Sequence, residues 1–92
     1  MSFSMPMRVE LKDVAKIIQD WERFESEVQG SVWTIDCANV VQFDSAFVAL
    51  LLYFLQRSLQ LDVKIHFCHV PSAWSLGVTE AVHARLISLM VV

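Results

Sequence analysis

The chain has 92 residues, of which 55% are hydrophobic and only 18% are charged, and its formal net charge is -3. A chain of this length is expected to form one domain, residues 1–92, that buries only about two-thirds of the surface its unfolded form exposes. With few charges to cover the rest, apolar residues should remain outside, and such patches usually mark contacts with a partner. The acidic balance argues against binding the phosphate backbone of nucleic acids.

The longest apolar run, residues 46–55, is about half as long as a membrane-spanning helix. The opening residues, MSFSMPMRVELKD, lack the basic flank and the apolar core of a secretory signal. We therefore expect a cytoplasmic protein without a membrane-spanning segment.

The first half of the chain predicts a strand, a helix and a second strand. MSFSMPM is expected to form a short strand that stops at Pro6, because proline has no N–H to donate to a ladder. Between Lys12 and Ser26, apolar residues recur at helical spacing with charged residues off that stripe, which predicts an amphipathic helix. The run SVWTIDCA, which follows Gly30, is typical of a strand mostly covered on both faces.

A second helix is expected to begin at Asp44 or Ser45 and to reach about Ser58. It is apolar almost all round, as buried helices are. The run DVKIHFCHV, residues 62–70, alternates apolar and polar positions and predicts a strand with one solvated face.

The last part of the chain predicts two helical segments. Pro71 and Ser72 open the first, and Gly77 is expected to cap its end because glycine adopts the left-handed conformation without penalty. From Val78 to Leu89, apolar residues again recur at helical spacing. The final LMVV fits a frayed end, a longer helix or a short strand equally well.

The alternation of strands and helices predicts a two-layer α/β domain with at least partly parallel pairing through right-handed crossovers. Asp44 and Ser45 stand where the central strand gives way to the buried helix. Functional sites of open α/β sheets usually lie at such a position.

The cysteines and histidines do not predict a metal site. Cys37 and Cys68 lie in apolar runs without a CxxC pair, so both are expected to be buried, reduced thiols. In the fragment HFCH, strand periodicity places His66 and Cys68 on one face and His69 on the other, and no second pair of ligands is evident. We therefore expect no metal and no other cofactor.

Ser45, in the sequence FDSAF, is a candidate for three roles. A nucleophile needs an adjacent base and a glycine-flanked elbow, and no glycine stands beside Ser45, so we expect no catalytic residue. Asp44 or Ser45 is expected to cap the helix by accepting a hydrogen bond from a free N–H of its first turn. Ser45 is also a candidate phospho-acceptor, although repulsion from Asp44 should outweigh the attraction of the helix N-terminus, so that a phosphate would disturb this surface.

The segment TIDCANVVQFDSAFVALLLYFL resembles the signature of the STAS domain family. That family includes SpoIIAA-like anti-sigma factor antagonists, the tails of sulfate transporters and the small MlaB-like subunits of phospholipid-transport ABC systems. Its pattern is an apolar strand ending in aspartate, a small residue, valine, an apolar residue with Asp-Ser or Asp-Thr, a small residue, glycine and leucine. The corresponding positions here are Ile35, Asp36, Ala38, Val40, Phe43, Asp44, Ser45, Ala46, Phe47 and Val48. The likeness extends from Met5 over the rest of the chain.

The resemblance implies a two-layer STAS-like domain with a mixed sheet of four to five strands and three to four helices. The short chain is most similar to the MlaB-like subunits, which implies a non-enzymatic cytoplasmic adaptor that binds and stabilises the ATPase subunit of a phospholipid-transport ABC complex at the inner face of the inner membrane. The alternative that the family offers is an anti-sigma factor antagonist, switched when an anti-sigma factor kinase phosphorylates Ser45. The identity of the partner or lipid and the oligomeric state, a homodimer included, stay open.

The resemblance also implies a partner-binding surface at the start of the second helix. Its residues are Phe43, Asp44, Ser45, Phe47, Val48 and Ser72. Phe47 replaces the glycine of the family pattern, and we expect its ring either to block the close approach of a partner or to anchor one.

Overall fold

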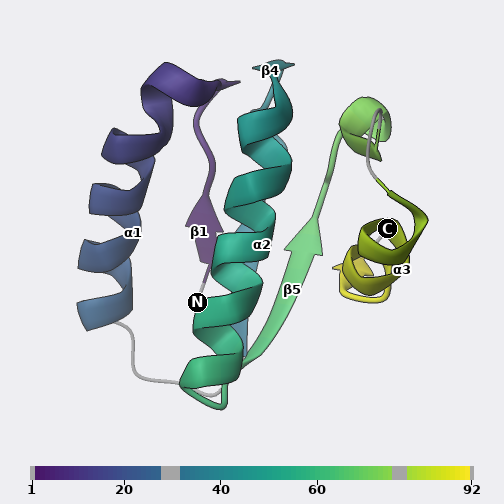
Figure 1. Ribbon diagram of the computed structural model, residues 1–92. Coiled ribbons are helices and arrows are strands. Elements are labelled where there is room, and N and C mark those ends of the chain that lie inside the picture. Colours follow the sequence, from purple (N-terminus) through teal and green to yellow (C-terminus); the bar gives the residue numbers. More distant parts are fainter. Residues whose placement is uncertain (1, 28–31, 76–78, 92) are drawn as a thin grey trace.

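The computed structural model describes residues 2–27, 32–75 and 79–91 (Figure 1). Within these ranges the α-helices are α1 (Val14–Glu27), α2 (Ser45–Gln60) and α3 (Glu80–Ile87). Two short 3-10 helices are η1 (Leu11–Asp13) and η2 (Ser72–Ser75). The strands are β1 (Ser2–Ser4), β2 (Arg8–Val9), β3 (Val32–Asp36), β4 (Gln42–Phe43), β5 (Lys64–Cys68) and β6 (Met90–Val91).

The main sheet has four strands in the order β1-β3-β5-β6, and β2 pairs separately with β4. Every pairing between described strands is parallel, whereas the family resemblance implies a mixed sheet. Parallel pairing follows because α1, α2 and α3 each carry the chain back to the same end of the sheet before the next strand begins. The expected two-layer α/β architecture is confirmed.

Helices α1 and α2 lie side by side over one face of the sheet (Figure 1). The strand residues that face them are buried: Phe3, Trp33, Ile35, Ile65 and Phe67. On the opposite face, Lys64 and His66 are exposed, and Thr34 and Asp36 are half-buried. The expectation that the strand after Gly30 is mostly covered on both faces is therefore wrong for the second face, where Val32 is exposed and Thr34 and Asp36 are only half-buried.

An aromatic cluster joins the two layers. The ring of Trp21, from α1, is fully buried and lies 5.4 Å from Phe3, 4.9 Å from Trp33 and 4.8 Å from Phe54, measured between ring centroids. Aromatic pairs of this kind contribute about 0.5 to 1.5 kcal/mol each beyond the burial of their surface. One side chain of α1 thus contacts β1, β3 and α2.

The predicted elements are found with small shifts of their ends. The first helix is preceded by η1, and the second begins at Ser45 as expected but continues to Gln60. The segment after Pro71 is the single turn η2. Of the three conformations that LMVV allowed, the structure has a short strand, β6. Gly77 and Val78 lie outside the described residues. No helix within the described ranges combines the length and the apolar character that a membrane crossing requires.

Candidate functional site

Asp44 holds the starts of two helices together. Its Oδ1 accepts a hydrogen bond from the N–H of Ala46 at 2.8 Å and so caps α2, while its Oδ2 accepts one from the N–H of Leu11 at 3.1 Å, where η1 begins. The expected cap is confirmed, and Asp44 is the residue that makes it. Since Leu11 and Asp44 are 33 positions apart, the same carboxylate also fixes how the N-terminal segment lies against α2.

Charged side chains stiffen the segment before α1. Arg8 donates to both carboxylate oxygens of Asp13, at 2.9 and 3.0 Å, and this contact lowers the pKa of Asp13 and raises that of Arg8. The side chains of Glu10 and Asp13 form a capping box at η1. The amide of Gln42 donates to Glu10 at 3.1 Å, which ties β4 to the same segment.

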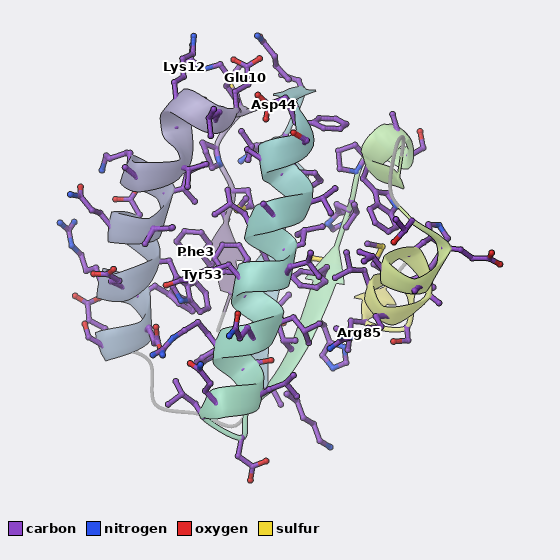
Figure 2. The ribbon with its side chains drawn as sticks, in the orientation of Figure 1. Phe3, Glu10, Lys12, Asp44, Tyr53 and Arg85 are labelled. Carbon is purple, nitrogen blue, oxygen red and sulfur yellow. The ribbon has the colours of Figure 1, made fainter. Side chains whose placement is uncertain are left out.

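Three large apolar side chains are exposed next to these polar contacts. Leu11 is 77% exposed, Val41 72% and Met7 66%, the highest values among the large hydrophobic residues that the structure describes. The N–H of Val41 donates to the carbonyl of Met7 at 2.9 Å, and Leu11 is held by Asp44, so all three lie at the end of the molecule where α2 begins. Figure 2 marks this end by the labels of Glu10 and Asp44. We call Met7, Leu11 and Val41 the apolar tip.

An apolar groove of about 620 Å³ opens between the first half of α2, the turn η2 and the start of α3. Among its lining residues are Phe43, Val48, Leu52, Trp74 and Val82. The ring of Trp74 stacks on that of His83 with centroids 5.1 Å apart, which holds η2 against α3. The groove has the volume of a typical small-ligand pocket and can also receive a few apolar side chains of another protein.

Most of the predicted partner-binding residues meet at this groove. Those that line it are Phe43, Asp44, Ser45 and Val48. Ser72 is exposed on η2, directly before the lining residue Ala73. Ser45 is exposed as the first residue of α2, so its hydroxyl is within reach of another molecule.

Phe47 does not belong to this surface. Its side chain is fully buried, with its ring centroid 5.2 Å from that of Phe43. The expectation that Phe47 blocks or anchors a partner is wrong, because helical periodicity turns it toward the core together with Leu50, Leu51 and Phe54.

Comparison with known proteins identifies no relative. No protein-family model, no curated protein and no solved structure matches this chain. The resemblance to STAS domains therefore stays a prediction.

The exposure of Met7, Leu11 and Val41 at one tip was not predicted from the sequence. A usable signal was the pair Val40 and Val41: neighbouring residues of an extended segment point to opposite sides, so one of two adjacent valines must leave the core. Val40 is buried and Val41 is exposed. For Met7 and Leu11 the sequence offers no comparable signal, because their exposure follows from where β2 and η1 lie.

The two cysteines differ in burial. Both are free thiols, and Cys37 is buried as expected, which raises its pKa to about 12. Cys68 is only half-buried, so the expectation is wrong for this residue. The reason is that Cys68 ends β5 on the sheet face that the helices leave open.

Proposed function

We propose that this protein is a non-enzymatic cytoplasmic adaptor with a STAS-like fold, similar to the MlaB-like subunits, that binds and stabilises the ATPase subunit of a phospholipid-transport ABC complex. The observation that carries the proposal is the position of the apolar tip beside the apolar groove, at the start of α2. The resemblance implies a partner-binding surface at the same place.

The composition of the tip favours a protein partner. Its three apolar side chains are flanked by Arg8, Glu10 and Lys12, whose charged groups form ion pairs. An apolar centre with a polar rim is typical of protein interfaces. Burying one such apolar side chain against a partner contributes about 1.5 to 3 kcal/mol.

The hydrogen bonds and ion pair that hold the apolar tip also favour binding of a protein partner. Asp44, the capping box of η1 and the bidentate pair of Arg8 and Asp13 hold the backbone of the tip in place before any partner arrives. A preordered surface loses less conformational entropy on binding than a mobile one.

The groove beside the tip indicates the kind of segment that the ATPase subunit would contribute. An amphipathic helix can place apolar side chains at successive turns into an apolar groove. Asp44 lines the groove and Glu80 follows its lining residue Thr79, so a basic residue near the end of that helix would be favoured.

Co-purification from native extract tests the proposal. The wild-type chain should recover an ABC-transporter ATPase, and Leu11→Ser or Val41→Ser should weaken binding to the purified ATPase by roughly tenfold or more, since each removes the burial of one apolar side chain. Leu59→Ser is the matched control, because Leu59 is 65% exposed but lies near the opposite end of α2. Recovery of no ATPase, or an equal loss with Leu59→Ser, would contradict the proposal.

The exposure of Ser45 supports a second candidate, an anti-sigma factor antagonist switched by phosphorylation. A kinase must reach the hydroxyl, and the first turn of α2 leaves it accessible. Intact-mass measurement of the protein isolated from its native cells distinguishes the two candidates. A phosphate that is lost in Ser45→Ala, with recovery of a kinase in place of an ATPase, would favour the switch.

A further inference from the structure

A second cluster of polar side chains lies on the open face of the sheet, away from α1 and α2. Asp36 ends β3 and Cys68 ends β5, and the two are paired across these neighbouring parallel strands. His69 follows directly. A carboxylate oxygen of Asp36, the Sγ of Cys68 and a ring nitrogen of His69 all lie within 4.8 Å of one another.

The backbone of His69 explains why strand periodicity failed to predict this cluster. His69 has a φ of 57°, a left-handed conformation that residues with a Cβ rarely adopt. The chain leaves the strand geometry there, and the ring turns to Asp36, with Nδ1 3.1 Å from Oδ1. Backbone strain of this kind is concentrated at binding and catalytic sites, where the surrounding contacts maintain it.

We propose that Asp36, Cys68 and His69 form a binding site for a zinc ion. Zinc takes thiolate sulfur at about 2.3 Å and imidazole nitrogen or carboxylate oxygen at about 2.0 to 2.2 Å. At these bond lengths, tetrahedral geometry separates the ligand atoms by roughly 3.3 to 3.6 Å, so the present spacing needs only small side-chain rotations. Magnesium and calcium prefer all-oxygen sites, whereas sulfur and nitrogen ligands select zinc and its neighbours in the transition series.

The surroundings prepare the Asp36 carboxylate for binding a cation and act against ionisation of the Cys68 thiol. The N–H of Ala38 donates to the Asp36 carboxylate at 2.9 Å, which lowers the pKa of Asp36 and fixes the direction of its oxygens, as outer hydrogen bonds do at metal sites. Burial raises the pKa of the Cys68 thiol, which opposes zinc binding, and zinc would have to displace the thiol proton to solvent as the Zn–S bond forms. At His69, zinc would take the place of the hydrogen that Nδ1 shares with Oδ1 of Asp36, and the ring would keep its proton on Nε2.

The fourth position of the site faces outward. The His69 side chain is 66% exposed, so water or a group from another molecule can complete the tetrahedron. Asp36 and Cys68 end the parallel strands β3 and β5, so the zinc site lies at the carboxyl end of the sheet, which is the end where α2 begins.

Zinc titration of the full chain after chelator treatment tests the site. Calorimetry should find one equivalent of Zn²⁺, and Cys68→Ala or His69→Ala should each weaken binding by about tenfold or more. His66→Ala is the matched control, since His66 is an exposed histidine on the same strand outside the cluster. Cobalt should give a thiolate-to-metal charge-transfer band that is absent from Cys68→Ala.

Two further variants separate zinc binding from folding. His69→Gly suits the left-handed backbone and should keep the metal-free melting temperature while losing zinc affinity. Asp36→Asn keeps an acceptor for the Ala38 N–H but removes the charge of the ligand. Absence of zinc binding by the wild type, retention of the cobalt band in Cys68→Ala, or an equal loss with His66→Ala would overturn the site, and none of these results depends on the ATPase.

Discussion

The Asp44 carboxylate accepts backbone hydrogen bonds from two segments that are far apart in the chain. Its role as the cap of α2 could be predicted from its place before an apolar helix. The bond to Leu11 could not, because no local pattern indicates that η1 returns to this corner. Asp44, which the sequence predicts as a helix cap, therefore also connects the N-terminal segment to α2.

Replacing Asp44 tests this double role. Asp44→Ala should lower the free energy of unfolding by about 2 kcal/mol, since it removes a helix cap and a second backbone hydrogen bond. Ser45→Ala should change it far less, because Ser45 is exposed and the cap is made by Asp44. Urea denaturation measures both values. Equal losses in the two variants would contradict both stabilising roles of Asp44, the cap of α2 and the bond to Leu11.

At the scale of elements, the two apolar faces of α2 differ: one packs in the core and the other lines the groove. Its core face carries Phe47, Leu50 and Phe54, which are fully or almost fully buried, whereas Val48 and Leu52 are half-buried and line the groove. The sequence predicts a helix covered nearly all round because both faces are apolar. Without charges to mark the uncovered side, hydropathy cannot distinguish a wall of a groove from a part of the core.

Matched variants on the two faces should give opposite results. Phe47→Ala should lower the free energy of unfolding by about 3 to 5 kcal/mol through the cavity it leaves. Phe47→Leu should lower the free energy of unfolding by about 1 kcal/mol and leave the affinity of the folded protein for the proposed ATPase partner unchanged.

Val48→Ser, on the groove face, should weaken that affinity with a smaller loss of stability than Phe47→Ala. Thermal denaturation measures the change in stability, and binding to the purified, proposed ATPase partner measures the change in affinity. A loss of affinity with Phe47→Leu as large as with Val48→Ser would contradict the division of the helix into two faces.

At the scale of the whole molecule, the fold is a single layer of helices on one face of a parallel sheet. The core therefore lies between the helices and one face of the sheet. The rings around Trp21 pack there and come from α1, α2, β1 and β3. Phe3 connects the edge strand β1 to this cluster.

The contribution of β1 can be measured at Phe3. Phe3→Ala should lower the free energy of unfolding by about 3 to 5 kcal/mol and shift tryptophan fluorescence to longer wavelength, because water gains access to the Trp21 ring. Ser4→Ala, at an exposed position of the same strand, is the control and should change neither quantity. An unchanged emission spectrum in Phe3→Ala would show that β1 does not seal the cluster.

The sequence by itself determined the order and type of the main elements, the cap before α2 and the surplus of apolar surface, since hydrophobic periodicity, capping residues and composition act within a few residues or over the whole chain. Tertiary structure alone decided which sheet face stays open, which apolar face of α2 packs on the core, and that Met7, Leu11 and Val41 lie at one tip. It also brought Asp36 to Cys68 and His69. These features depend on contacts between residues more than 30 positions apart, and local patterns carry no information about which distant segments will pack together.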